Sequence, residues 1–238
     1  LAAALASGAD ALVVIDLINL EHWHRVCRDT WTAAHGPLIY ISGVPRDTMS
    51  CNLCYDQNGV GALAAHHLIT SGYQRLAYLS MCTDSWSRDR AQGASRHATK
   101  RDIPLLRCDD MASAPFNASF EWDADGFARA LAPQLTRALV SGDGPLGLIC
   151  GNDRMALTVA DLLNDSGHAA GTVGLIGFDG SETCRHRGIS SVALPLDAFG
   201  RRACTLLCDA SNGTQPPSRE LLSGQVLARA STWLQPKL

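Results

Sequence analysis

Two kinds of segment alternate along most of this chain: short runs rich in β-branched residues and leucine, and longer runs whose apolar residues recur at helical spacing. The short runs predict strands at residues 11–15, 38–42, 75–80, 104–108, 146–150 and 173–178. The longer runs predict helices at residues 17–34, 59–71, 88–99, 124–141, 153–165 and 197–211. Such alternation predicts an α/β fold with mostly parallel sheets.

Length and composition narrow the class of protein. The 238 residues, 46% of them hydrophobic, predict one or two compact lobes. A formal net charge of -3 gives no electrostatic reason to expect that these residues alone bind nucleic acid. Nine cysteines, an odd number scattered through apolar stretches, are typical of reduced thiols in a cytoplasmic protein. The sequence contains no stretch that predicts a membrane span, and its apolar start at residues 1–6 lacks the basic leader of a signal peptide.

Several motifs that would indicate enzymatic or metal chemistry are weak or absent. Residues 59–64 match the letters of a dinucleotide-binding fingerprint, but residues 51–58 ahead of them are polar and are not expected to form the buried strand that the motif requires. Cys51 and Cys54 have the spacing of metal ligands without a second Cys or His pair at a suitable distance. No nucleophile elbow or pair of catalytic carboxylates is recognisable. We therefore predict no enzymatic activity, no cofactor and no metal site.

Three polar residues follow predicted strands: Arg90, Asn152 and Asp179. Ligands of open α/β sheets bind beyond the carboxyl ends of the strands, so these side chains are expected to lie at one site. Together they offer fixed donors, a mixed donor and acceptor, and a pure acceptor, which can satisfy adjacent hydroxyls of a sugar. The alternative roles are local: Asp179 would cap a turn, Asn152 would cap a helix, and Arg90 would be a solvated helix charge.

Six segments of the chain, in order, resemble the ligand-binding domain of LacI/GalR transcriptional regulators. They are GVGALAAHHLITSGYQRLAYLS (59–80), SRDRAQG (87–93), GLICGNDRMALTVADLLNDSG (147–167), GTVGLIGFDGSE (171–182), ISSVALPLDAFGRRACTLL (189–207) and VLARAST (226–232). The resemblance implies a periplasmic-binding-protein-like type I fold, in which two Rossmann-like lobes with parallel sheets are joined by a three-strand hinge. It assigns residues 1–80 with 194–216 to the first lobe, and residues 81–193 with 217–238 to the second.

The resemblance also implies an effector site. In it, Arg90 supplies the guanidinium, Asn152 the amide at a helix start and Asp179 the carboxylate, and Asn152 fits the sugar-responding members better than the purine-responding type. Trp122, or alternatively Phe120, matches the aromatic residue that stacks on the effector. The expected ligand-binding residues are Arg90, Asn152, Asp179, Trp122, Trp86 and Phe178. For Trp86 two roles remain open: it shields the cleft, or it packs on a lobe surface.

These inferences predict the effector-sensing domain of a LacI-type regulator, which binds a small molecule, a sugar or sugar derivative, in the cleft between its lobes. The family's helix-turn-helix headpiece is absent from this sequence, so operator DNA binding and a homodimer are implied for the full-length protein, with no membrane partner. The alternative is the solute-binding protein of a sugar transporter, which shares the fold but works in another compartment. An enzyme is the third hypothesis. The run at residues 229–232 resembles the ending of the regulators and favours the first.

Overall fold

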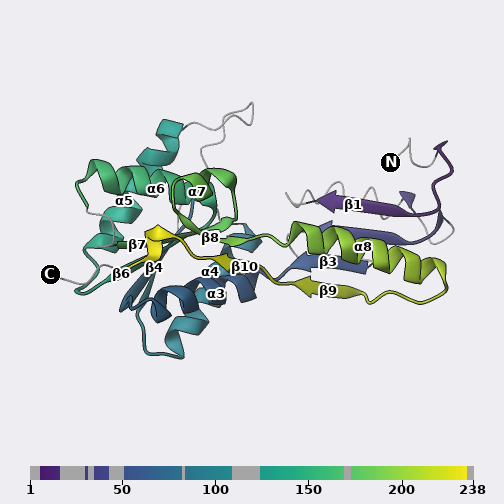
Figure 1. Cartoon of the computed structure of the whole chain (residues 1–238), viewed down its shortest axis with the longest axis horizontal. Helices are drawn as coiled ribbons and strands as arrows, with labels where there is room; N and C mark the ends of the chain where they lie inside the picture. The colour runs from purple at the N-terminus through teal and green to yellow at the C-terminus, as the bar shows by residue number, and fades with distance from the viewer. Residues whose placement is uncertain are drawn as a thin grey trace. The chain divides into compact units, whose positions relative to one another are not determined.

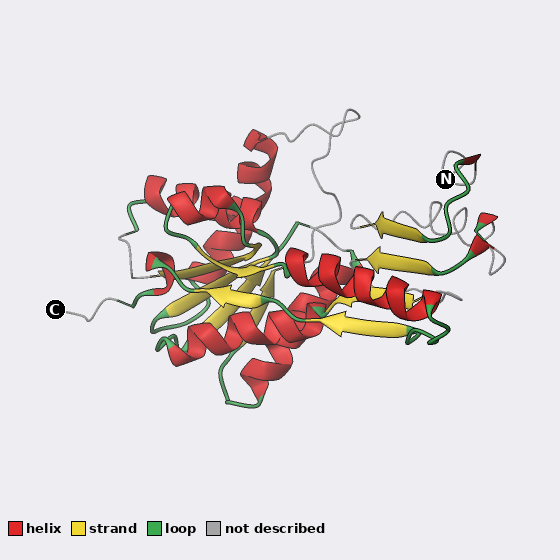
Figure 2. Ribbon diagram, turned by 45° about the vertical axis from the view of Figure 1, so that its right-hand side comes forward, coloured by secondary structure: helices red, strands yellow, loops and turns green. Residues whose placement is uncertain are grey.

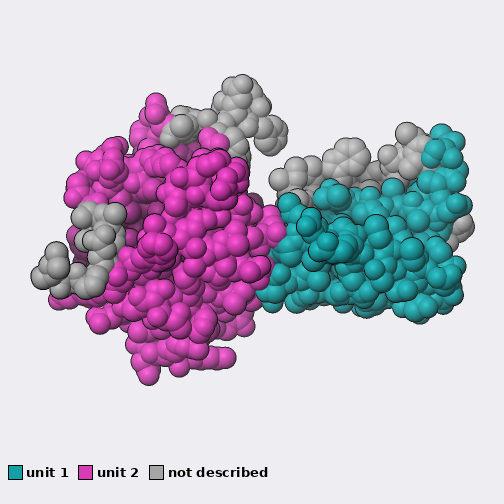
Figure 3. Space-filling model, in the orientation of Figure 1, with its two compact units in different colours: residues 1–56, 195–223 teal, residues 57–194, 224–238 magenta. Residues whose placement is uncertain are grey.

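The computed structural model describes residues 6–16, 30–31, 35–42, 51–81, 84–108, 124–168 and 173–234. The chain divides into two compact units, Leu1–Asp56 with Pro195–Ser223 and Gln57–Leu194 with Gly224–Leu238 (Figure 3). Each unit contains its own sheet with helices packed on it (Figures 1 and 2). The predicted α/β fold with mostly parallel strands is confirmed.

The first unit is built on a four-stranded parallel sheet in the order β1-β2-β3-β9. Its strands are β1 (Leu12–Asp16), β2 (Leu38–Ser42), β3 (Cys51–Tyr55) and β9 (Arg219–Leu222). Helix α8 (Leu196–Ser211) buries Phe199, Ala203 and Leu206, whose spacing puts them on one helix face. Arg202 of α8 donates to both carboxylate oxygens of Glu220 on β9, at 2.8 and 2.9 Å. The predicted helix at residues 17–34 lies almost wholly outside the described residues.

Strand β3 contradicts one of the sequence predictions. Residues 51–58 were not expected to form a buried strand because they are polar, whereas all five residues of β3 are buried. The strand pairs with β2 on one side and with β9 on the other, so both of its edges are covered and even Asn52 is taken out of solvent. Burial raises the pKa of the Cys51 thiol to about 11, which keeps it protonated.

The second unit is built on a six-stranded sheet in the order β10-β8-β7-β6-β4-β5, parallel except for β10. Its strands are β4 (Arg75–Leu79), β5 (Leu105–Cys108), β6 (Leu146–Cys150), β7 (Val173–Asp179), β8 (Ser190–Ala193) and β10 (Gln225–Leu227). The helices are α3 (Gln57–Thr70), α4 (Ser85–Thr99), α5 (Ala124–Leu139), α6 (Asp153–Asp165), α7 (Glu182–His186) and the short 3-10 helix η2 (Ala230–Thr232). Helices α3 and α4 cover one face of the sheet and α5 and α6 cover the other (Figures 1 and 2).

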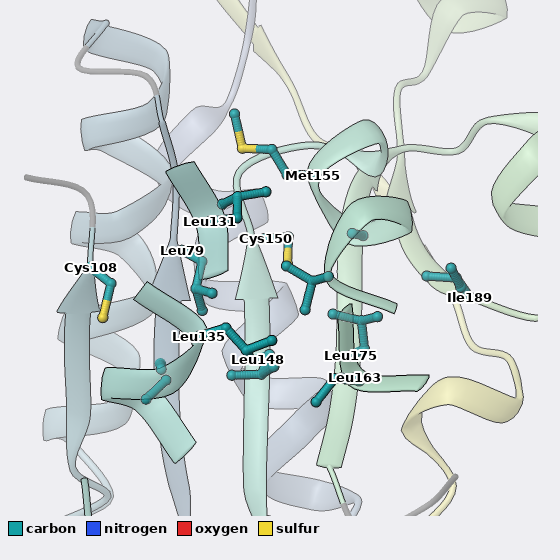
Figure 4. Packing of buried hydrophobic residues seen from close by; sticks show 14 of the residues in the cluster. Leu79, Cys108, Leu131, Leu135, Leu148, Cys150, Met155, Leu163, Leu175 and Ile189 are labelled. Carbon is teal, nitrogen blue, oxygen red and sulfur yellow. The ribbon is translucent and has the colours of Figure 1, made fainter. Parts of the chain in front are cut away.

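Leucine side chains from neighbouring strands form the core of the second unit. Leu79 of β4, Leu148 of β6 and Leu175 of β7 pack against leucines of α5 and α6 (Figure 4). All five residues of β6 are buried, because this central strand has a neighbour on each edge and helices on both faces. Its continuous apolar run is therefore visible in the sequence, and the predicted strand has the observed bounds.

The boundary between the two units differs from the expected one. The first lobe was expected to include residues up to 80, whereas the first unit ends at Asp56. Helix α3 packs on α4, and β4 lies between β5 and β6, so both belong to the second unit. Residues 217–223 were expected in the second lobe, but they join the first unit because β9 pairs with β3.

Helices α3 and α4 approach each other so closely that their backbones are in contact. A Cβ atom on Gly61 of α3 would lie 2.0 Å from the carbonyl oxygen of Arg90 on α4, and one on Gly93 would lie 1.9 Å from the carbonyl oxygen of Asn58. The glycine-rich run at residues 59–64 therefore serves helix packing, and it holds the backbone of Arg90 in place.

The run at residues 229–232 is fastened to the second unit by hydroxyl groups. Ser231 accepts a hydrogen bond from the Ser190 N–H at 2.8 Å and donates to the carbonyl oxygen of Leu175 at 2.6 Å. Thr232 is hydrogen-bonded through its hydroxyl to Ser190 Oγ and to His67 Nε2, both at 2.8 Å. The hydroxyl groups of Ser231 and Thr232 therefore connect residues 229–232 to β7, β8 and α3.

The described cysteines are all free. Five are buried and two, Cys204 and Cys208 on α8, are exposed, which agrees in large part with the expectation of reduced thiols that pack as small apolar residues. Among the helices that the structure describes, none has both the length and the apolar character needed to span a membrane.

Candidate functional site

The guanidinium of Arg90 is the centre of a buried polar cluster at the carboxyl ends of β6 and β7. Its Nε donates to Gln57 Oε1 of α3 and its Nη1 donates to the carbonyl oxygen of Gly151, both at 2.7 Å. Its Nη2 lies 3.9 Å from Asp179 Oδ1 at the end of β7. The side chain is only 6% exposed, so Arg90 is not the solvated helix charge that was considered as its alternative role.

Two aromatic rings enclose the Arg90 guanidinium. The centre of the Phe178 ring lies 4.5 Å from its Cζ and that of the Trp86 ring 4.8 Å. Phe178 is fully buried, so its ring packs against Arg90 and offers no exposed surface to a ligand. Trp86 is half-buried and donates from Nε1 to Asp84 Oδ2 at 3.3 Å. Both of these predicted site residues therefore lie against the guanidinium.

Asp179 ends β7 in the left-handed region, with φ at +107°, a conformation that Asp and Asn adopt more readily than most residues. Its side chain is 41% exposed, so the carboxylate is accessible beside Arg90. Partial burial raises the pKa of Asp179 to about 6, against the opposing effect of the Arg90 charge, and the negative charge of Asp153 adds to the rise.

Asn152 takes the local role that was its alternative. It is the N-cap of α6, and its Oδ1 accepts a hydrogen bond from the Met155 N–H at 2.9 Å. Its side-chain nitrogen is left as the group that can donate to a ligand. The predicted aromatic residue, Trp122 or Phe120, lies outside the described residues.

Two residues of the cluster were not predicted from the sequence. Gln57 is 33 positions from Arg90, and no local pattern marks it as a partner. Asp153 is 3% exposed and its carboxylate accepts hydrogen bonds from the Ser181 N–H and the Ser191 hydroxyl. In the sequence it reads as an acidic residue in the first turn of a helix. The glycine at position 177 in β7 is the sequence feature related to the burial of Asp153, because a Cβ there would lie 2.4 Å from Asp153 Oδ1.

The cluster is suited to recognition of a polar ligand without a net charge. Arg90 and Asp179 balance each other's charge, and their separation of 3.9 Å is longer than a hydrogen bond. A donor and an acceptor at this spacing can each engage one of two adjacent hydroxyl groups. Among the described residues, no group of three or more His, Cys, Asp or Glu side chains is arranged to hold a metal ion.

The raised pKa of Asp179 predicts a pH-dependent contribution to stability. A carboxyl whose pKa is higher in the fold than in the unfolded chain favours the protonated folded state, so its stabilising effect is full below pH about 4 and is lost as pH rises through about 6. We expect Asp179→Asn to gain stability relative to the wild type between pH 4 and pH 7.5, by about 1 kcal/mol after allowance for solvent screening of this partly exposed side chain. Urea denaturation of both proteins across this pH range measures the difference; a constant difference would contradict the prediction.

Comparisons with known proteins agree with this fold. The family model of the periplasmic binding protein-like domain matches residues 65–232, a span that contains Arg90, Asn152 and Asp179. No curated protein sequence matches the chain. Eight similar solved structures share 14–21% sequence identity with it, so their similarity concerns the fold.

Several of these structures cover nearly the whole chain. A LacI family transcriptional regulator from Enterococcus faecium with bound ribose has a TM-score of 0.70 and 19% identity, over 97% of this chain and 82% of its own. The transcriptional regulator CelR in complex with cellobiose has a TM-score of 0.70 and 21% identity, over 97% and 69%. A sugar-binding LacI family regulator from Escherichia coli, complexed with phosphate, has a TM-score of 0.71 and 20% identity, over 97% and 79%. The chain therefore belongs to the family of periplasmic binding protein-like domains and has the fold of LacI-family transcriptional regulators that the sequence resemblance predicted.

Proposed function

We propose that this chain is the effector-sensing domain of a LacI-type transcriptional regulator and that it binds a sugar or sugar derivative at the carboxyl ends of β6 and β7. The observation that carries this proposal is the Arg90 guanidinium, which is buried, hydrogen-bonded to Gln57 and Gly151, and 3.9 Å from the accessible Asp179 carboxylate. A preorganised donor next to a preorganised acceptor binds a diol with little loss of side-chain entropy.

The chemistry of the ligand follows from the balance of charge. An anionic ligand would meet the Asp179 carboxylate, and a cationic one would meet Arg90, so a neutral polyhydroxyl compound suits the pair best. The apolar face of a sugar ring would stack on an aromatic side chain, for which Trp122 is our candidate. Asn152 would donate from its side-chain nitrogen. Ribose and cellobiose in the similar structures are ligands of this chemical class.

A regulator is favoured over the solute-binding protein of a transporter, because the similar structures described above are transcriptional regulators. In this proposal the full-length protein is a cytoplasmic homodimer, and sugar binding to this domain changes its affinity for operator DNA. An electrophoretic mobility assay with the full-length protein tests that role: a sugar that binds this chain should shift the operator affinity. A sugar that binds with no effect on DNA affinity would favour the transporter.

The ligand class is tested by thermal denaturation in the presence of neutral sugars, sugar acids and purines. A ligand at about 100 times its Kd stabilises the folded state by about 2.7 kcal/mol, which raises the Tm of a chain this size by roughly 5–10 °C. We expect neutral sugars, with D-ribose and cellobiose as first probes, to have this effect, and Asp179→Ala to abolish it. Asp165→Ala, which removes an exposed carboxylate from α6, is the control that should keep it. Stabilisation by purines alone, unchanged in Asp179→Ala, would overturn the site.

A further inference from the structure

A second aspartate, Asp153, joins three elements around the end of β7. It stands in the first turn of α6 and its side chain is buried. Its Oδ1 accepts from the Ser191 hydroxyl on β8, and its Oδ2 accepts from the Ser181 N–H at the N-cap of α7, both at 2.6 Å. Both carboxylate oxygens are thus used inside the protein, and neither needs a ligand.

The hydrogen bonds of Asp153 converge on the turn that carries Asp179. Asp179 and Gly180 both have positive φ, at +107° and +73°. The Gly180 N–H donates to Ser191 Oγ at 2.9 Å, and Ser191 in turn donates to Asp153. The amide of Ser181 is therefore hydrogen-bonded directly to Asp153, and the amide of Gly180 is linked to Asp153 through the Ser191 hydroxyl. A backbone conformation of this kind persists only where its surroundings hold it.

The space for Asp153 is provided by a glycine. A Cβ on Gly177 would lie 2.4 Å from Asp153 Oδ1 and 3.0 Å from its Cα. The absence of a side chain at Gly177 therefore leaves room for the Asp153 carboxylate to pack against β7. The Cys184 thiol adds a contact of 3.6 Å to the Asp153 carbonyl oxygen.

We propose that Asp153 is a positioning residue for the ligand site: it contacts no ligand, and it holds the turn at residues 179–181 so that the Asp179 carboxylate stays beside Arg90. This inference rests on the proposed function for its consequence in ligand binding. The conformation of the turn can be measured without any ligand, which separates the two proposals.

The first test is amide hydrogen exchange in Asp153→Asn, which loses the negative charge and keeps one accepting oxygen in place of the two that accept from Ser181 N–H and the Ser191 hydroxyl. We expect exchange at Gly180 and Ser181 to accelerate about tenfold or more, since a hydrogen bond to a charged acceptor is lost, while Leu148 at the centre of β6 keeps its rate. Asp165→Asn makes the same change of charge on the exposed face of α6 and should leave all three rates unaltered. Unchanged exchange at Gly180 and Ser181, or equal acceleration at Leu148, would overturn the positioning role.

The second test is the titration of Asp179, followed through its carboxyl carbon by NMR. The negative charge of Asp153 raises the pKa of Asp179, and the backbone hydrogen bond from Asp153, which lowers it, is kept in Asp153→Asn, so the titration midpoint is expected to move to lower pH. A midpoint that stays in place would contradict the placement of Asp179 next to the Asp153 charge.

Calorimetric titration with D-ribose and with cellobiose then measures the consequence for binding. If either sugar binds the wild type, its affinity should fall about tenfold or more in Asp153→Asn and stay unchanged in Asp165→Asn. Equal affinity of Asp153→Asn and wild type would overturn the positioning role even if the turn had loosened. If neither sugar binds the wild type, the choice of ligand fails, and hydrogen exchange decides the role of Asp153.

Discussion

Arg90→Ala is expected to destabilise the second unit by about 3 kcal/mol and to abolish stabilisation by sugars. The guanidinium satisfies two acceptors, Gln57 Oε1 and the carbonyl oxygen of Gly151, and it supplies the positive charge beside Asp179. Removing a buried charged donor leaves these acceptors unsatisfied, at a cost of roughly 1–3 kcal/mol each. It also removes the cation that packs between Phe178 and Trp86. Urea denaturation and thermal shift with sugars measure the two effects.

Two further variants distinguish the effect of Arg90 on stability from its effect on sugar binding. Arg90→Lys keeps the charge, but an ammonium lacks the planar fork that reaches Gln57 and Gly151 together, so we expect a smaller loss of stability and a full loss of sugar binding. Arg88→Ala removes an exposed arginine from the same helix and should change the free energy of unfolding by less than about 0.5 kcal/mol. If Arg90→Ala behaved like Arg88→Ala, the buried cluster would not be a determinant of either property.

Gly61→Ala is expected to destabilise the second unit by about 3 kcal/mol or more. The added methyl group would lie 2.0 Å from the carbonyl oxygen of Arg90, and no change of rotamer can move a backbone atom away. Helices α3 and α4 would have to separate along their contact, and the Arg90 side chain would leave its place. Gly93→Ala makes the reciprocal clash, 1.9 Å from the carbonyl oxygen of Asn58, and should have a similar effect. Urea denaturation measures the loss, and sugar binding should weaken with it.

Gly200→Ala provides the matched control for these two substitutions. Gly200 also lies within a helix, α8, but apart from its own stretch of helix no atom of the described residues lies within 4 Å of the position that its Cβ would take. Because alanine is the better helix former, this variant should gain stability by up to about 1 kcal/mol. Similar stability changes at Gly61 and Gly200 would show that helix propensity, and not the close contact of α3 with α4, decides the outcome.

The α/β class was predictable because each element has its own period of burial. The central strand β6 is apolar throughout, and α8 repeats apolar residues at helical spacing, so both can be recognised without knowledge of their partners. The location of Asp179 at the end of a strand was predictable for the same reason, and Arg90 lies on helix α4, which follows β4. Strand β3 was missed because its polar sequence does not report its place between β2 and β9, and β9 comes from a distant part of the chain.

The sequence by itself determined the alternation of strands and helices over most of the chain and which polar residues follow the strands, since these depend on local pattern. Only the tertiary structure decided that Gln57 and Gly151 hold Arg90, that Asp153 fastens the turn after Asp179, and that Gly61 lies against the Arg90 backbone. It also moved the boundary between the units to Asp56. The contacts made by Arg90, Asp153 and Gly61 join residues 28 to 61 positions apart. Such contacts depend on how whole helices and strands pack, which the local spacing of apolar residues does not report.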